Sequence, residues 1–400
     1  MQREHLATLP YHIAIVTTHP IQYQAPWFRA MAAHPELDLE VFFCHHATPS
    51  QHAEAGFGVE FDWDVPLLEG YRFCFLKNVA AHASVNHFSG LDTPQIGDII
   101  REQRFHAVIN CGWHRKSYWQ SIRACWKTRT PVMVRSDSHL HTERTALKAA
   151  LKLPAYRLFI PRMDACLAVG IRARDYFLRY GARRDRVFLV PHAIDERRFS
   201  ANAVRLAPCR PQLRADWKLP DDTAVFLWAA KFIPKKRPLD FLRALDIAAR
   251  SGARIHGLMV GDGPLRAESE AMARERGVPV TFAGFLNQSE IVKSYVACDM
   301  LVLPSDGGET WGLVANEAMV CGRPCMVSDK VGCGPDLVTP ETGAVFPLGD
   351  VDRLAALMSK FAGDRDFLRT MGEAAARKIT EYSTEAAVRG VLEAVHAVAR

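Results

Sequence analysis

The feature of this 400-residue sequence that most constrains its fold is a repeated alternation of short apolar runs with longer segments of helical period. Buried strands of a parallel sheet read as such runs, and the helices between them cover the sheet faces. We expect strands at 12–17, 39–44, 107–111, 132–135, 165–169 and 187–190, and again at 224–229, 256–260, 280–283, 300–304 and 324–328. The expected helices include 117–128, 171–180, 238–250, 264–276, 289–297 and 313–321. Two such series predict an α/β protein with two doubly wound domains.

A polar, proline-containing stretch without a clear period separates the two series at about 200–220, and we expect the linker there. The predicted domains are Rossmann-like units at 1–200 and 201–382, followed by a terminal helix at 383–400 that packs back on the first domain. Ligands of open parallel sheets bind beyond the carboxyl ends of the strands. The chemistry is therefore expected where the two sets of strand ends face each other.

Composition excludes several classes of protein. With 48% hydrophobic and 24% charged residues, the chain is neither collagen-like nor disordered. It has no apolar run long enough to cross a membrane, and its N-terminus lacks the basic flank and cleavage site of a signal peptide. The ten cysteines include no Cys-x-x-Cys pair, and no His-Glu-x-x-His occurs. We expect a cytoplasmic protein with reduced thiols and without a structural metal.

Charge is distributed unevenly, because residues 101–250 carry a strong excess of Lys and Arg between two more acidic ends. Phosphate groups, anionic lipid or nucleic acid would each fit such a region, and so would a solvated basic face without a ligand. Within it, Lys148, Lys152, Arg157 and Arg162 alternate with apolar residues at partly helical spacing. This stretch could lie on an anionic membrane at the inner face of the plasma membrane, or pack on the sheet, which is the commoner case.

Two lysines follow the first strand of the second series. Lys231 leaves the strand, and Lys236 stands just before Pro238, which is well placed to open a helix. Ammonium groups beside a helix N-terminus can hold a diphosphate, although a solvated basic loop explains the residues equally well. The next strand ends at Gly261 in a Gly-x-Gly turn, which lacks the third glycine of a dinucleotide fingerprint.

Two glutamates mark a later strand end. Glu309 lies in a glycine-rich loop, and Glu317 lies on the helix that Gly322 terminates. Carboxylates can accept paired hydrogen bonds from the vicinal hydroxyls of a ribose or a hexose. The backbone N–H groups from Thr310 to Leu313, at the start of that helix, favour phosphate.

These residues resemble a known family. The segment ETWGLVANE from Glu309 to Glu317, the pair Lys231 and Lys236, and the motifs VGDGPL and VTFAGFL match retaining glycosyltransferases of family 4 in order and spacing. The resemblance covers most of the chain, is most specific in the second domain, and implies the GT-B architecture. Departures are Thr310 and Trp311, where many members carry Pro and Phe.

The resemblance implies roles for individual residues. Glu309 would hold hydroxyls of the donor sugar, Glu317 would hold the ribose, and Lys231 and Lys236 would hold the diphosphate. The remaining donor-binding positions it implies are Gly261, Phe285 and Leu286, the last two near the base, and Thr310, Gly312 and Leu313 at the diphosphate.

The first domain matches the family less well. Its first strand ends in HPIQYQ, so His19, Gln22 and Tyr23 are expected on the acceptor side. The strand ending in VRSDSHL adds Arg135 there, and either Asp137 or His139 would contact the donor sugar. A turn or helix-cap role for Asp137 stays open. A further segment, FDWDVPLLEGY, is typical of a bacterial subgroup of the family.

The resulting hypothesis is a retaining hexosyltransferase of cell-surface glycan or glycoconjugate biosynthesis. It would use a nucleoside diphosphate sugar, UDP or GDP first among the candidates, and no cofactor or metal. The proposed catalytic residues are Glu309, Lys236, Lys231, Asp137 and His139, and the acceptor would be a small molecule, a glycan or a lipid-linked sugar. The alternatives are an epimerase or hydrolase of the same fold, and a nucleic-acid-binding protein, against which the absence of a known reader motif counts.

Overall fold

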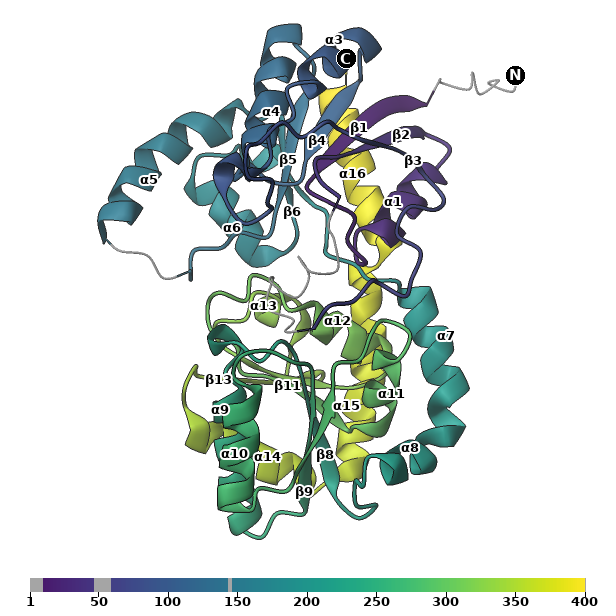
Figure 1. Cartoon of the computed structure of the whole chain (residues 1–400), viewed down its shortest axis with the longest axis vertical. Helices are drawn as coiled ribbons and strands as arrows, with labels where there is room; N and C mark the ends of the chain where they lie inside the picture. The colour runs from purple at the N-terminus through teal and green to yellow at the C-terminus, as the bar shows by residue number, and fades with distance from the viewer. Residues whose placement is uncertain (1–9, 47–58, 143–145, 400) are drawn as a thin grey trace.

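A computed structural model of the chain describes residues 10–46, 59–142 and 146–399, with the side chains of 146–151 left out of the description. In these residues, two wholly parallel sheets form two lobes (Figure 1). The first sheet has the order β3-β2-β1-β4-β5-β6-β7, with bounds Arg72–Phe75, Leu37–Phe43, Tyr11–Thr17, Ala107–Asn110, Val132–Ser136, Ala165–Ala168 and Val187–Leu189. The second has the order β10-β9-β8-β11-β12-β13, with bounds Val280–Gly284, Ile255–Val260, Ala224–Ala229, Met300–Leu303, Cys325–Ser328 and Gly343–Phe346. Both sheets reverse their strand order beside the first strand of the lobe, so the predicted doubly wound α/β class is confirmed.

Helices cover both faces of each sheet. Those of the first lobe are α1 Ala25–Ala32, α3 Ile96–Gln103, α4 Lys116–Thr128, α5 Ala146–Phe159 and α6 Ile171–Arg179. They are followed by α7 Glu196–Leu206, α8 Arg210–Asp216, α9 Pro238–Arg250, α10 Arg266–Arg276, α11 Ile291–Ala297, α12 Leu313–Val320, α13 Gly334–Leu337, α14 Val351–Ala362, α15 Arg365–Lys378 and α16 Thr384–Val398. Every strand and helix predicted from the sequence is present, within one or two residues of its predicted ends.

The structure adds elements that the hydrophobic pattern did not indicate. Strands β3 and β13 are partly exposed, and β3 begins with an arginine, so neither has the pattern of a fully buried strand. The stretch 200–220, predicted as a linker without regular structure, contains the end of α7 and all of α8 instead. Phe199 and Leu206 are the buried residues of α7, which is too few to show a period, and the helix is held by packing against α11 and α12.

Apolar packing joins the two lobes. One cluster of buried side chains runs from the face of the first sheet under α3, α4 and α6 to the face of the second sheet under α11 and α12. The lobes are also tied by polar contacts, because the Arg172 guanidinium donates to the backbone carbonyls of Asp329 and Lys330, each at 2.7 Å. The strand ends of the two sheets therefore face each other at a fixed separation.

The chain returns to the first lobe at its end. Helix α16, yellow in Figure 1, packs against α1, β6 and β7, with Ala387, Val391 and Ala394 buried under the first sheet. Among the described residues, no helix combines the length and the apolar character needed to cross a membrane. In the basic stretch, the Lys152 ammonium lies 4.5 Å from the ring centres of Tyr156 and Tyr176, whereas Lys148 falls among the side chains that the structure does not describe.

Candidate functional site

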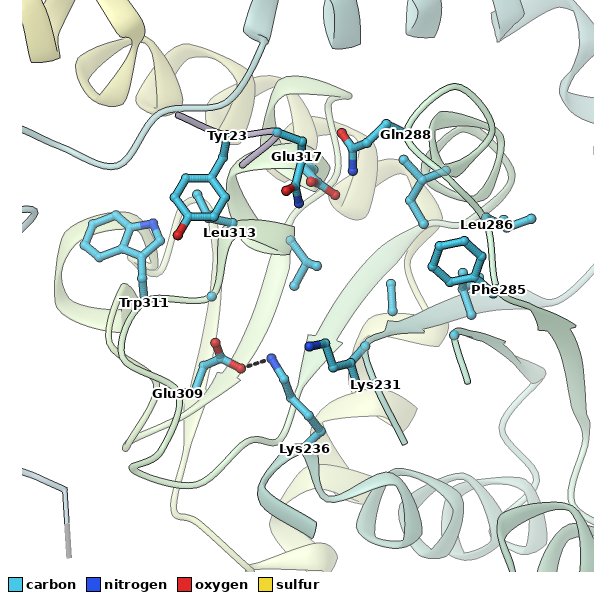
Figure 2. A pocket seen from close by; sticks show the side chains of 18 of the residues that line it. Tyr23, Lys231, Lys236, Phe285, Leu286, Gln288, Glu309, Trp311, Leu313 and Glu317 are labelled. Carbon is cyan, nitrogen blue, oxygen red and sulfur yellow. Dashed lines mark hydrogen bonds and ion pairs between the residues drawn. The ribbon is translucent and has the colours of Figure 1, made fainter. Parts of the chain in front are cut away.

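A cavity of about 370 Å³ lies between the lobes, at the carboxyl ends of both sheets (Figure 2). The first lobe and the segment that connects the lobes contribute polar and aromatic side chains to its wall, namely Gln22, Tyr23, Trp63, Asp137 and His192. The second lobe contributes loops that follow β8, β9, β10 and β11, with Lys231, Lys236, Gly261, Phe285, Leu286, Glu309, Thr310, Gly312, Leu313 and Glu317 among the lining residues. Nearly all residues predicted to bind a donor thus line one cavity.

Lys231 and Lys236 lie where the loops after β8 and β11 meet, in a region called the lysine corner here. The Lys236 ammonium and the Glu309 carboxylate form an ion pair, drawn as a dashed line in Figure 2, and Lys231 lies beside it. Burial opposes ionisation of Glu309, but the attraction of Lys236 and a hydrogen bond from it outweigh burial and hold the pKa of Glu309 below its usual value. Burial and the repulsion of Lys236 and Lys235 lower the pKa of Lys231 to about 8. A bound anion would relieve that repulsion.

Helix α12 begins at the edge of this corner. Gly312 precedes the helix with φ of +101°, and a Cβ there would lie 2.7 Å from the Leu303 side chain, so glycine is needed at this turn. The N–H groups of Gly312 and Leu313 donate no hydrogen bond to any described residue. They are the unpaired donors of a helix start, at which an anionic group is favourable.

Glu317 is held on the inner wall by neighbouring polar groups. The Tyr295 hydroxyl donates to its carboxylate at 2.5 Å. Arg198 donates to the side-chain oxygen of Gln288 at 2.8 Å, which turns the Gln288 amide toward Glu317. Burial outweighs these groups and raises the pKa of Glu317 to about 7. The side chain can therefore accept or donate hydrogen bonds near neutral pH.

This shift predicts a pH effect on stability. From about pH 4.5, the usual value for the carboxyl, to about 7, folded Glu317 keeps a proton that the unfolded chain has lost. The contribution to stability is present below pH 4.5 and is lost as the pH rises through 7. Glu317→Gln cannot ionise, so we expect its free energy of unfolding, relative to wild type, to rise by about 2–3 kcal/mol between pH 4.5 and pH 8. Urea unfolding at the two pH values measures this, with the exposed Glu275→Gln as control. Parallel pH dependence of Glu317→Gln and wild type would contradict it.

The turn after β9 forms part of the cavity wall. Gly261 has φ of +132°, and a Cβ on it would lie 1.9 Å from the carbonyl oxygen of Ala230. No side chain fits between these two backbone segments. The glycine thus lets the loops after β8 and β9 lie against each other and form the cavity floor.

The first lobe faces the cavity with a second group of polar side chains. Asp137 accepts a hydrogen bond from the Thr310 hydroxyl at 2.7 Å, so the two lobes touch at the site itself. Burial opposes its charge, but His192, the Thr310 hydroxyl and Arg135 together lower the pKa of Asp137. The Tyr23 ring meets the His192 ring edge-on at 5.5 Å. Asp137 is therefore an ionised carboxylate that the first lobe contributes to the cavity.

Some predicted residues lie outside the cavity wall. Arg135 is buried beneath Trp27 and donates to the Pro191 carbonyl at 3.0 Å, so it supports the segment that carries His192. His139 is buried, and burial together with the Arg172 and His141 charges lowers its pKa to about 4. His19 contacts the Thr18 hydroxyl at 3.0 Å and does not line the cavity. Sequence reasoning missed Trp63, His192 and Gln288, which come from loops, and Arg198, which lies on α7.

Comparison with known proteins identifies the second lobe. Residues 210–378 match the model of the family described as "Glycosyl transferases group 1". The matched region contains the lysine corner, the start of α12 and Glu317. Within residues 210–378, this match confirms the family predicted from the Glu309–Glu317 motif.

Two relatives and one solved structure extend the likeness beyond the matched region. The chain is 27% identical to a D-inositol 3-phosphate glycosyltransferase of Nocardia farcinica, over 83% of this chain and 77% of the relative. It is 29% identical to a GDP-mannose-dependent monoacylated α-(1-6)-phosphatidylinositol monomannoside mannosyltransferase of Corynebacterium glutamicum, over 49% of this chain and 52% of the relative. Its fold is similar to Anabaena HepE in complex with UDP and glucose, with a TM-score of 0.69 and 14% identity, over 96% of this chain and 99% of that one. The fold is GT-B, as predicted.

Proposed function

We propose that this chain, whose residues 210–378 match the glycosyl transferases group 1 family, is a retaining hexosyltransferase that uses a nucleoside diphosphate sugar. The observation that carries the proposal is one cavity in which the lysine pair, the open start of α12 and Glu317 meet the Asp137 carboxylate of the other lobe. Cationic groups and a polar wall on opposite sides suit a donor that has an anionic part and a sugar part. The acceptor hydroxyl would enter from the first lobe, beside Gln22 and Tyr23.

The donor is proposed to span the second lobe. Its diphosphate would lie between Lys231, Lys236 and the N–H groups of Gly312 and Leu313, and its ribose would reach Glu317. Its base would rest near Phe285 and Leu286. The UDP complex of HepE and the GDP-mannose-dependent relative make UDP and GDP the first nucleotides to test.

The proposed reaction exchanges one bond at the anomeric carbon for another on the same face of the sugar. The bond to the diphosphate oxygen breaks, and its electron pair leaves with the diphosphate. The acceptor oxygen bonds to the anomeric carbon, and its proton passes to the departing phosphate oxygen. Positive groups at Lys231 and Lys236 would stabilise the charge that develops on the leaving group, a term that is commonly large in catalysis. Glu309 and Asp137 would stabilise the positive charge that develops on the sugar.

The proposal is tested by turnover with defined donors. Purified protein is incubated with UDP-glucose or GDP-mannose and an acceptor panel of polyols, glycans and lipid-linked sugars. Release of nucleoside diphosphate that depends on the acceptor, with an α-linked product by proton NMR, is expected. Equal release without acceptor would instead indicate a hydrolase, and an inverted product would contradict retention.

Metal dependence provides an independent prediction. In the proposed orientation, the diphosphate of the donor faces two lysines and two backbone N–H groups. We therefore expect turnover in excess EDTA to stay within about twofold of the untreated rate. The measurement is the initial rate before and after chelation. Full loss in EDTA, restored by Mg²⁺ or Mn²⁺, would mean that a cation performs the role assigned to the lysines.

A further inference from the structure

An extended segment of the first lobe, residues 61–64, reaches the second lobe beside the cavity. It is called the strap here, and it carries the sequence FDWD that follows the grey trace in the dark blue part of Figure 1. The strap contacts the loop after β10, residues 285–289, which follows Gly284. The two segments are separated by more than two hundred residues in the sequence and belong to different lobes.

Polar contacts anchor the strap to that loop. The Asn287 side-chain amide donates to the backbone carbonyl of Asp62 at 2.8 Å. The Ser289 N–H donates to the Asp64 carboxylate at 3.1 Å, and the Ser289 hydroxyl also donates to that carboxylate. Three donors of one short loop are therefore directed at the strap. Contacts of this kind fix the position of a segment that has no secondary structure of its own.

Aromatic side chains fill the space between the anchors. The Phe61 ring lies 4.6 Å from the Phe285 ring and 4.8 Å from the Trp63 ring, the second contact being edge-on. Trp63 lines the cavity together with Phe285 and Leu286, and it is half-buried. The strap thus adds an aromatic wall from one lobe to an apolar wall from the other.

Charge separates this end of the cavity from the lysine corner. Asp62 and Asp64 flank Trp63 in the sequence, whereas Lys231 and Lys236 lie beside Glu309 in Figure 2. An anionic diphosphate would be repelled by the strap and attracted by the lysines. The part of a donor that fits beside Trp63 is therefore an uncharged, flat, apolar group with polar edges. In a nucleoside diphosphate sugar, this group is the base.

We propose that Trp63 is a donor-binding residue that contacts the nucleobase, and that the strap makes nucleotide affinity depend on both lobes. This inference rests on the proposed function and adds a binding residue outside the second lobe. Aromatic side chains can stack on the face of any nucleobase. The anchored loop also carries Gln288, whose backbone carbonyl accepts a hydrogen bond from Arg198 at 2.6 Å, so this loop joins the strap to the neighbours of Glu317.

The test compares nucleotide with inorganic pyrophosphate binding. Isothermal titration calorimetry of the full chain with UDP, GDP and pyrophosphate is run on wild type and Trp63→Ala. We expect the Kd for UDP or GDP to rise about tenfold or more in Trp63→Ala, with pyrophosphate affinity changed by less than about twofold. Equal weakening for nucleotide and pyrophosphate would overturn the inference, and so would nucleotide binding at the wild-type level.

Control variants keep the result interpretable. Trp126→Ala removes an exposed tryptophan of α4 that does not line the cavity and should bind as wild type does. Trp63→Phe should retain most of the affinity, and Asp64→Ala, which removes one anchor, should raise the nucleotide Kd about fivefold. If the single variants Asp64→Ala and Trp63→Ala both bound nucleotide as wild type does, the inference would be overturned, even if one of them were less stable. A wild-type protein that binds no nucleoside diphosphate would contradict the proposed function instead.

Discussion

Replacing Lys236 with alanine is expected to lower kcat/KM for the donor by roughly 30- to 1000-fold, which corresponds to about 2–4 kcal/mol of transition-state stabilisation. The ammonium lies in the cavity wall, is largely buried and pairs with Glu309, so it can act on a departing diphosphate without first being ordered. Loss of this charge removes an attraction that grows as the leaving group becomes more negative. The measurement is initial-rate kinetics over a range of donor concentrations.

Lys235→Ala is the matched control for that experiment. Lys235 belongs to the same turn, Pro234–Lys236, but its ammonium donates to the Gly308 carbonyl at 3.3 Å and does not line the cavity. We expect its kcat/KM to stay within about threefold of wild type. If the two variants lose activity equally, the effect would be one of general charge near the site, and Lys236 would have no specific role.

Glu309→Gln and Glu317→Gln are expected to separate turnover from donor binding. Glu309 is the carboxylate beside the lysine corner, and in the proposed orientation it faces the sugar ring, whose positive charge grows as the glycosidic bond breaks. A neutral amide there removes stabilisation specific to the transition state, so kcat should fall about 100-fold with little change in donor KM. The amide can still accept the hydrogen bond from Lys236, which limits disturbance of the fold.

Glu317 should behave differently because the ribose does not change during the reaction. Its loss removes binding that is equal in ground and transition states, so Glu317→Gln should raise the donor KM about tenfold and leave kcat nearly unchanged. Calorimetry with UDP and GDP provides the second readout. Free nucleotide should bind Glu309→Gln almost normally and Glu317→Gln weakly. An equal fall in nucleotide affinity in both variants would mean that the proposed orientation of the donor is wrong.

The site of the second lobe was largely predictable because its residues follow strand ends in sequence order. Lys231, Gly261 and Glu309 follow buried apolar strands and Phe285 follows the half-buried strand β10, and parallel topology brings such positions to one edge of the sheet. Pro238 and Gly322 marked helix ends that the structure confirms within two residues. Local chemistry and topology therefore agree throughout this lobe.

Other parts of the site depend on tertiary contacts that leave no local pattern. Arg198 lies on α7, which has too few buried residues for its helical period to be seen in the sequence. Its contact with Gln288 forms only because α7 packs on α11. His192 lies on the segment between the lobes, and its carbonyl accepts a hydrogen bond from Asn316 at 3.1 Å. Trp63 reaches the cavity from an extended segment with neither helical nor strand structure. Each depends on contacts between segments that are distant in the sequence.

The first lobe shows where strand-end reasoning stops. Gln22, Tyr23 and Asp137 line the cavity as the position of their strand ends predicts. Arg135 is the last but one residue of β5, and its side chain turns under Trp27 instead of toward the cleft. A shift of one residue along a strand reverses the face to which a side chain points, and no hydrophobic pattern distinguishes the two choices at a polar strand end.

Binding of the donor in this cleft is tested most directly by calorimetric titration of UDP and GDP, in EDTA, into wild type and into the double variant Lys231→Ala/Lys236→Ala. One nucleoside diphosphate per chain should bind wild type without a metal, and the double variant should bind it at least about 100-fold more weakly while unfolding at a similar temperature. Failure of wild type to bind any nucleoside diphosphate, or equal affinity in the double variant, would contradict the assignment of this cavity as the donor site.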